Sequence, residues 1–320
     1  RRSPGRSPGM STPLIHLPRW RLLSAAACLP TPLHGVAQAQ GAVIGILEGR
    51  ATLLRPTGKF ELAEGAVLSA ADIVKTAAAG FMQIEFADGV RLALGEGSRL
   101  MLAAGAALAN TARARLLQGW MKLTPGTDKP IAGEFLTPLR AIGSLAGACI
   151  VHAEANQFEL FVESGMIALT ERGGAARQIK GGDFLYGRAN AALAAAARLA
   201  PDFVQRMPRL FRDALPARAA KFRDRPAAPR ALGAVSYADV AAWLQADEAI
   251  RVPLVASWRV RLSDKEFHAA VLANLVQHPE WRVLVLPPPP KKPVPRPLPV
   301  PVPRRAPPPD PAASSASVPS

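Results

Sequence analysis

Hydrophobic and polar residues alternate along the first half of the sequence. The alternation is clearest over residues 81–86 and again over 90–94, with Asp88 and Gly89 between the two runs. A period of two predicts strands, and an Asp-Gly pair supplies the positive-φ glycine that a tight turn requires. We therefore predict a β-hairpin at Asp88-Gly89, with Gln83 and Glu85 opposite its apolar side.

The same pattern extends over residues 40–188 in short apolar runs bounded by glycine or polar residues. A polar residue and a glycine precede several of these runs, at Gly49, Gly89, Gly119 and Gly165. Many short strands with turn signals between them favour a sandwich or barrel. Because the spacing of the glycines is uneven, a strict repeat is not indicated. The predicted fold class is mainly β, with short strands in a sandwich or irregular β-solenoid.

The composition changes after Arg188. Residues 191–197 are rich in alanine, which favours a helix, and prolines then divide an arginine-rich region into short pieces. We interpret residues 189–230 as a basic helical linker. Two interpretations of this linker stay open. Either its apolar side chains pack on the β-region, or it is a solvated linker with aromatic anchors. Those side chains are Phe203, Met207, Leu210, Phe211 and Phe222.

Residues 231–286 predict a small helical subdomain. Capping boxes are expected at Ser236–Asp239 and at Ser263–Glu266, where a serine and an acidic residue three positions later satisfy each other's backbone N–H groups. Pro279 is expected to end the second helix. That helix would carry one apolar stripe, formed by Phe267, Val271, Leu272, Leu275 and Val276, which we interpret as packing.

Residues 287–320 form a proline-rich basic tail that is expected to be disordered. Proline runs favour extended polyproline II, which makes the tail a semi-rigid arm. It is either a passive spacer or a contact to an anionic partner such as the cell wall or lipid headgroups.

The first 39 residues have the features of an export signal. Met10 is the expected start, and two arginines are followed by a short apolar run and by Ala37-Gln38-Ala39, an A-x-A cleavage pattern. The apolar run is too short to span a bilayer. Cleavage after Ala39 predicts a periplasmic protein without a transmembrane helix. The alternative is lipoprotein anchoring through Cys28.

The net charge of +15 is unevenly distributed. Residues 40–197 hold 15 basic and 14 acidic side chains, whereas residues 198–230 hold nine and three. The excess therefore lies in the leader, the linker and the tail, and the predicted β-region is almost neutral. This distribution argues against a nucleic-acid partner, which a basic folded surface would favour.

Few residues suggest reactive chemistry. Cys149 and His152 lie three apart in a predicted strand, so they should point to opposite faces, and Cys149 is expected to be a small core residue. Once the leader is removed, Cys149 has no cysteine left to pair with. His268 and His278 flank one predicted helix without further ligand residues.

Asp72 and Asp88 are interpreted as turn residues whose carboxylates accept hydrogen bonds from nearby backbone. The sequence contains no Walker loop, nucleophile elbow or dinucleotide fingerprint. We therefore predict no catalytic, cofactor-binding or metal-binding residues, no cofactor and no enzymatic activity.

Several motifs together resemble the FecR domain, a periplasmic sensor of iron-siderophore regulators that relay a transporter signal to a sigma factor. The resemblance covers about residues 41–188. The motifs are Gly41-Ala42-Val43, the run from Leu68 to Thr76, Phe86-Ala87-Asp88-Gly89, Leu117-Gln118-Gly119-Trp120, Thr137-Pro138, Glu163-Ser164-Gly165 and Gly181-Gly182-Asp183.

The chain departs from that family in two motifs. Residues 145–148 replace a glycine-threonine pair, and Ala71 stands where a glycine precedes the aspartate. The cytoplasmic domain and membrane helix of those regulators also have no counterpart here.

The resemblance implies an exported, non-enzymatic binding, scaffolding or sensing module that contacts an envelope protein. The alternatives are an accessory regulator of a transporter-coupled, iron-responsive sigma pathway and a cell-wall-associated enzyme with an unrecognised site.

Overall fold

The computed structural model describes residues 41–103, 112–127, 130, 133–171, 174–189, 191–196 and 198–286. The predicted leader and the proline-rich tail lie outside these residues. The described part of the protein is mainly β, with 41% of its residues in strands and 24% in helices. This confirms the predicted fold class. In the part of the chain that the structure describes, no helix is both long and apolar enough to cross a membrane.

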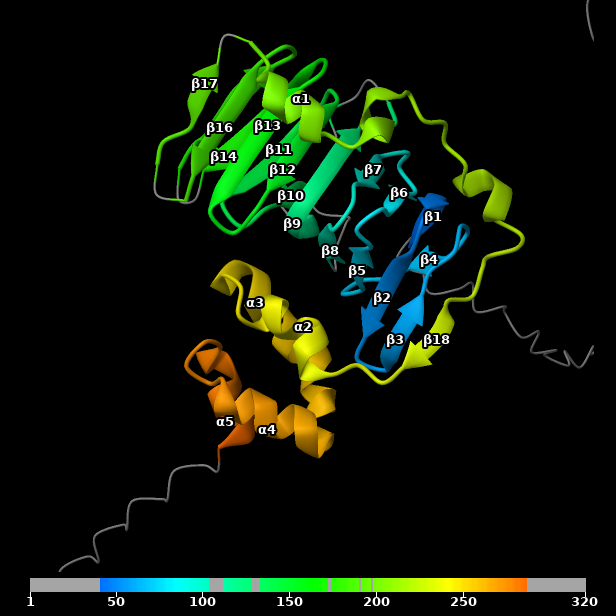
Figure 1. Cartoon of the computed structure of the whole chain (residues 1–320), viewed down its shortest axis with the longest axis vertical. Helices are drawn as coiled ribbons and strands as arrows, with labels where there is room; N and C mark the ends of the chain where they lie inside the picture. Colours follow the sequence, from blue (N-terminus) through cyan, green and yellow to red (C-terminus); the bar gives the residue numbers. More distant parts are fainter. Residues whose placement is uncertain are drawn as a thin grey trace, which may run out of the picture. The chain divides into compact units, whose positions relative to one another are not determined.

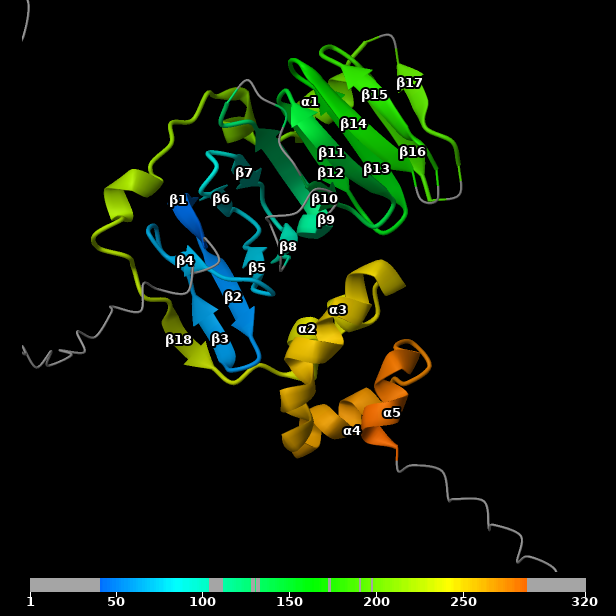
Figure 2. The same ribbon diagram turned by 180° about the vertical axis from the view of Figure 1, so that it is seen from behind.

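Eighteen strands of the described residues form one connected, curled sheet (Figures 1 and 2). The sheet is folded into two layers, A and B, and hairpins alternate between them along much of the chain. All neighbours in layer A are antiparallel. Their spatial order is β4 (Val67–Leu68), β1 (Ala42–Glu48), β6 (Phe81–Glu85), β7 (Arg91–Leu94), β9 (Ala112–Thr124), β12 (Cys149–Ala153), β13 (Gln157–Val162), β16 (Phe184–Arg188) and β17 (Ala194–Ala196).

Layer B shares β9 with layer A. Its neighbours are antiparallel except for the pair β9 and β10, which is parallel. The spatial order is β18 (Arg230–Gly233), β3 (Gly58–Glu61), β2 (Ala51–Arg55), β5 (Ile73–Thr76), β8 (Arg99–Leu102), β9, β10 (Glu134–Leu136), β11 (Arg140–Ala146), β14 (Met166–Glu171) and β15 (Ala176–Lys180).

The 13-residue strand β9 passes from layer B into layer A at Gly119. Up to Gln118 the strand pairs with β8 and β10, and from Gly119 onward it pairs with β7 and β12. Gly119 has a φ of 98°, and a Cβ there would lie 2.5 Å from the hydroxyl of Ser98. That hydroxyl bonds both to the backbone N–H of Trp120, at 2.9 Å, and to its carbonyl, at 3.0 Å. The glycine that was expected to begin a fresh strand is therefore the bend at which one strand changes layers.

The main core lies between the two layers. Inward-facing side chains of both contribute to it, including Ile84 and Leu160 from layer A and Leu53 and Ile167 from layer B. Burial at about 25 cal/mol per Å² makes this cluster the main stabilising contribution.

The predicted hairpin is confirmed. Strands β6 and β7 pair antiparallel, with Ile84 opposite Leu92, and Gly89 has a φ of 84°. The turn is also tied to β9, because the guanidinium of Arg113 lies 2.8 Å from the Asp88 carboxylate and 4.6 Å from the centre of the Phe86 ring.

Each layer also has an apolar outer face that is covered by the chain following β17. The outer face of layer A is covered by residues 198–222, which we call the strap (Figure 1, light green). The strap contains α1 (Pro201–Arg206) and the 3₁₀ turns η1 (Arg209–Arg212) and η2 (Ala219–Phe222). Phe203 and Phe211 are fully buried against layer A. The interpretation in which apolar side chains of this region pack on the β-region therefore holds for Phe203 and Phe211.

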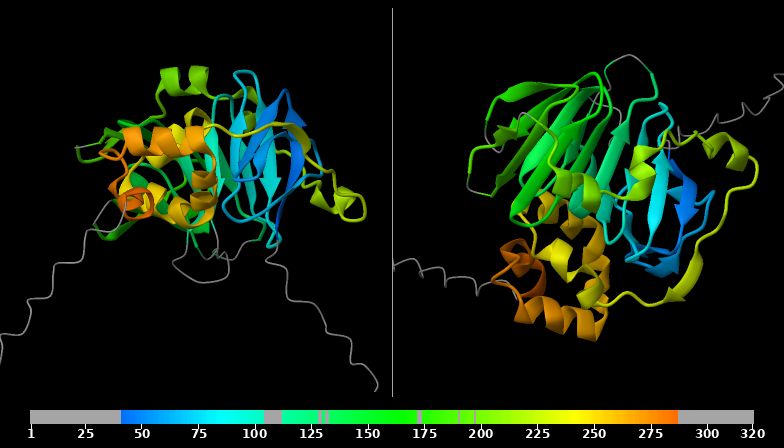
Figure 3. Two further views of the ribbon diagram at one scale, coloured as in Figure 1. Left: turned by 90° about the horizontal axis from the view of Figure 1, so that it is seen from below. Right: turned by 45° about the horizontal axis from the view of Figure 1, so that its top comes forward.

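A group of short helices packs on the outer face of layer B through Leu54, Ile73 and Met101 (Figure 3). These helices are α2 (Tyr237–Leu244), α3 (Glu248–Trp258), η3 (Arg259–Ser263), α4 (Lys265–Ala273), η4 (Pro279–Trp281) and α5 (Arg282–Val285). Three buried tryptophans, Trp243, Trp258 and Trp281, form the centre of the group.

The capping box at Ser236 and Asp239 is confirmed, whereas the one at Ser263 is wrong. The carboxylate of Asp264 caps α4 instead, accepting from the N–H groups of Glu266 and Phe267. Because η3 runs to Ser263, the hydroxyl of Ser263 bonds back to the carbonyl of Val260.

The apolar stripe of α4 is narrower than predicted. Helix α4 ends at Ala273, before Pro279, so the last residues of the pattern no longer follow helical periodicity. Phe267 and Val271 are buried, whereas Val276 is 94% exposed.

The described residues 191–196 of the alanine-rich segment do not form the predicted helix. Ala194–Ala196 forms β17, which pairs with β16. An open sheet edge next to the segment outweighs the helix propensity of alanine, which is worth only a few tenths of a kcal/mol per residue.

Ala71 occupies a left-handed conformation with a φ of 64°, which no other non-glycine residue of the described part adopts. The Ala71 N–H donates to the carbonyl of Leu102, and the next residue, Asp72, is held by a bidentate pair with Arg55 at 2.6 and 2.7 Å. The Asp72 carboxylate also accepts from the N–H of Ser69, as predicted for a turn residue. These contacts hold Ala71 in the left-handed backbone conformation, which costs a non-glycine residue about 1–2 kcal/mol.

We expect Ala71→Gly to raise the free energy of unfolding by about 0.5–1 kcal/mol, because relief of the left-handed strain exceeds the extra chain entropy of glycine. Ala70→Gly is the matched control. Ala70 has no positive φ, so its substitution should lower the free energy of unfolding by about 0.5 kcal/mol. Urea unfolding of both variants measures the difference, and an Ala71→Gly variant less stable than the parent would contradict this account.

Candidate functional site

Cys149 and His152 lie on opposite faces of β12, as predicted. Cys149 is fully buried in the main core, where desolvation, assisted by the negative charge of Glu163, raises the pKa of its thiol to about 12. A thiol with such a pKa stays protonated and unreactive at neutral pH. Cys149 is therefore a core residue, and the geometry does not form a cysteine–histidine dyad.

His152 belongs to a polar cluster under the strap. Its Nδ1 lies 3.0 Å from the Glu159 carboxylate on the adjacent strand β13, and its ring contacts that of Trp120 in a tilted arrangement, at 4.4 Å between centroids. Arg206 of α1 donates to both oxygens of Glu159, at 2.9 and 3.0 Å. Burial alone would raise the pKa of Glu159, but the hydrogen bonds from His152 and Arg206 outweigh it and lower the pKa. The cluster thus fastens α1 to layer A by a charge-assisted contact.

The other candidate residues have structural contacts. Asp88 accepts from the N–H of Val90 at 3.3 Å, as expected for a turn residue. His278 is fully buried, and its Nε2 lies 3.0 Å from the hydroxyl of Tyr237; desolvation lowers its pKa. His268 lies on α4, whereas His278 lies beyond its end. Among the described residues, no group of three or more histidine, cysteine or acidic side chains is placed to hold a metal ion.

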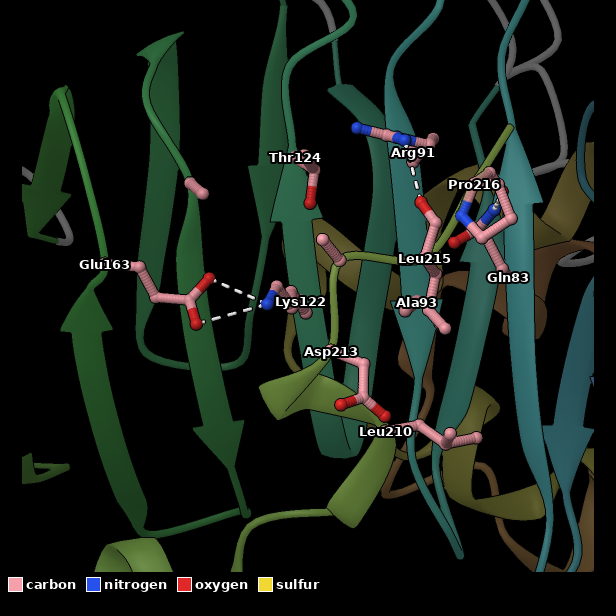
Figure 4. A pocket seen from close by; sticks show the side chains of 12 residues that line it. Gln83, Arg91, Ala93, Lys122, Thr124, Glu163, Leu210, Asp213, Leu215 and Pro216 are labelled. Atoms are coloured by element: carbon pink, nitrogen blue, oxygen red, sulfur yellow. Dashed lines mark hydrogen bonds and ion pairs between the residues drawn. The ribbon is translucent and has the colours of Figure 1, made fainter.

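A row of polar side chains on layer A binds the main chain of the strap. The residues come from β6, β7 and β9, and the strap crosses these strands without pairing with them. Gln83 donates to the carbonyl of Pro216 at 2.9 Å, Arg91 to that of Leu215 at 2.9 Å, and Lys122 to that of Phe211. Figure 4 shows Arg91 and Lys122 with their partners Leu215 and Glu163.

Glu85 completes the row. Its carboxylate accepts from the N–H groups of Arg218 and Ala219 at 2.7 and 2.9 Å, and from Gln83 at 3.1 Å. Gln83 and Glu85 are only 3% and 6% exposed. A buried carboxylate is costly unless its oxygens are hydrogen-bonded, and here the strap supplies those donors.

A cavity of about 440 Å³ lies between the row and the strap. It is within the size range of small ligand sites. The lining combines charged groups with apolar ones (Figure 4): Gln83, Arg91, Ala93, Lys122, Thr124, Ala148, Glu163, Leu210, Asp213, Ala214, Leu215 and Pro216. The ion pair between Lys122 and Glu163, at 2.8 Å, forms part of its wall.

The sequence did not indicate this site. Gln83 and Glu85 were recognised only as the polar side of a hairpin, and alternation does not distinguish a solvated face from one covered by a distant segment. The available signal was the set of aromatic residues in the linker, of which Phe203 and Phe211 cover the site.

A second feature of the β-region is the edge strand β15. Within the described residues it pairs only with β14, and four of its five residues are exposed. Gly181, just beyond β15, donates its N–H to Gly165 on the β14 side, whereas Lys180 donates to its own neighbour Asp183. Because alternate residues of an antiparallel strand direct their main-chain groups to opposite sides, Gln178 directs its N–H away from β14.

No protein-family model matches the sequence, and no curated protein matches it. Two crystal structures of a "putative anti-sigma factor" from Parabacteroides distasonis ATCC 8503, at 2.50 and 1.65 Å resolution, match this structure weakly, with a TM-score of 0.34. Each is 12% identical over 41% of this chain and 62% of its own. The chain thus spans less than two thirds of their length.

We expect Glu159→Gln to lower the free energy of unfolding by about 1–2 kcal/mol at pH 7, because Arg206 and His152 lose a charged partner. A carboxylate with a lowered folded pKa stabilises above its unfolded pKa, about 4.3, and this contribution is lost as pH falls through the folded pKa. The difference between the parent and the variant should therefore shrink as the pH falls from 7 to 3.

Glu154→Gln is the matched control, since the Glu154 side chain is 47% exposed and lies 3.6 Å from His152. Its effect should stay within about 0.5 kcal/mol at both pH values. Urea unfolding at pH 7 and pH 3 measures all three proteins. A Glu159→Gln effect independent of pH would show that the carboxylate charge does not hold α1.

Proposed function

We propose that the protein is an exported, non-enzymatic recognition module that binds a protein partner in the periplasm. The observation that carries this proposal is the β15 edge. An exposed edge strand presents unpaired main-chain groups, and addition of a strand from a partner is a common mode of peptide recognition. Basic side chains at Arg177 and Lys180 discourage self-association of this edge and favour a partner segment with acidic residues.

The export part of the proposal is supported by the leader in the sequence. An arginine pair, a short apolar run and an A-x-A site precede the β-region. The β-region contains a single cysteine, buried in the core, so its folding is compatible with an oxidising compartment.

A second version of this proposal is that the recognised partner belongs to a transporter-coupled sigma-factor pathway. It is favoured by the FecR-like motifs, whose central hairpin is formed in the structure. Unchanged iron-responsive transcription after deletion of the gene would exclude this version and leave the recognition module in place.

We expect Gln178→Pro to abolish partner retention, because it removes an outward-directed N–H at the β15 edge and leaves the ladder to β14 intact. Gln178→Val is the matched control, since it changes the side chain and keeps the N–H group. Both tagged variants are compared with the parent by cross-linking in envelope extract, and thermal unfolding checks that each is folded. Equal retention by the proline and valine variants would refute binding at this edge.

Fusion of alkaline phosphatase after Arg188 tests export. Alkaline phosphatase is active only outside the cytoplasm, so the fusion should be active and should lose activity when residues 10–39 are deleted. If the fusion that retains residues 10–39 were inactive, a periplasmic location would be contradicted.

A further inference from the structure

The middle of the strap, residues 209–219, is bound to layer A through its main chain. Three of its carbonyl oxygens and two of its N–H groups form the contacts described above, with Gln83, Glu85, Arg91 and Lys122. Recognition through main-chain groups depends little on the side chains of the bound segment, which makes it a common basis of peptide binding.

Within this middle part of the strap, one side chain enters the face deeply. Phe211 is fully buried and meets Phe81 edge-on at 6.2 Å between ring centroids. Leu210 and Leu215 are partly buried beside it, whereas residues 212–214 and 216–217 are exposed. The face therefore binds an aromatic anchor in a 3₁₀ turn and the main chain that follows it.

The two ends of this middle part are anchored independently. On one side, Arg206 binds Glu159 and Phe203 packs on Trp120 at 5.1 Å between ring centroids. On the other side, β18 pairs with β3. Residues 209–219 can therefore leave the face while α1 and β18 stay in place.

The face beneath the strap is suited to an exchange of occupants. Its side chains at Gln83, Glu85, Arg91 and Lys122 are polar, so their exposure to water carries no large penalty, and the penalty falls on apolar side chains such as Phe81 and Ala93. The cavity of about 440 Å³ also shows that the strap leaves part of the groove unfilled.

We propose that this face of layer A is a binding site for a segment of another polypeptide that carries an aromatic anchor, and that the chain's own strap occupies it as an internal ligand. The partner's aromatic side chain takes the place of Phe211, its carbonyls accept from Arg91 and Lys122, and its N–H groups donate to Glu85. Most of the contacts are to the main chain, so the anchor and the path of the main chain decide which segments bind.

The test uses the full chain and a fluorescent peptide of residues 207–220. In the Phe211→Ala chain the strap loses its anchor while every residue of the receiving face is retained. We expect the peptide to bind this variant at least about tenfold more tightly than the parent, in which the tethered strap competes at an effective concentration of the order of millimolar. Fluorescence anisotropy measures both affinities.

Two controls separate specific binding from adhesion. The same peptide carrying Phe211→Ala should not bind, and adding Glu85→Gln and Lys122→Met to the Phe211→Ala chain should abolish binding of the unaltered peptide. If a folded Phe211→Ala chain binds the two peptides equally, or no better than the parent does, the strap is only a structural cover and the proposal is overturned.

Hydrogen exchange of the unaltered chain provides a test that does not depend on the variant folding. The N–H groups of Arg218 and Ala219 should exchange through local opening, at rates insensitive to low concentrations of denaturant. Exchange of these groups only through global unfolding would overturn the proposal. These residues are separate from the β15 edge, so failure of the Gln178→Pro test would leave this inference standing.

Discussion

Strand β9 is the constraint on which the fold depends, because one continuous strand belongs to both layers of the sheet. The change of layer occurs at Gly119, where a left-handed backbone and the absence of a Cβ let Ser98 bind the main chain on both sides of Trp120. The position of one layer relative to the other is therefore set by the continuous strand as well as by side-chain packing. The main core between them forms only if this bend is made.

The folded sheet creates a second requirement, since both layers are also apolar on their outer faces. The two outer faces are covered in different ways. Layer B is covered by helices that pack three buried tryptophans, whereas the strap over layer A is held partly by aromatic side chains and partly through its main chain. A cover held by a few main-chain contacts is easier to displace than a packed helical core, which makes layer A the more adaptable surface.

Local patterns in the sequence predicted the local structure well. The hairpin at Asp88-Gly89, the cap at Ser236 and the opposite faces of Cys149 and His152 all depend on interactions within a few residues. The errors arose where an adjacent element decided the outcome. Ala194–Ala196 pairs with β16, the strand just before it, and η3 runs to Ser263, so that Asp264 caps α4 instead.

The sequence by itself determined that the described part of residues 41–188 consists mainly of strands, because period-two alternation and glycine turns are properties of adjacent residues. It also determined that Cys149 and His152 do not form a dyad. Only the tertiary structure decided that Gln83 and Glu85 are buried and that their partners are main-chain groups of residues 216–219. Those contacts join positions more than 130 residues apart, and main-chain partners leave no signature in the order of side chains.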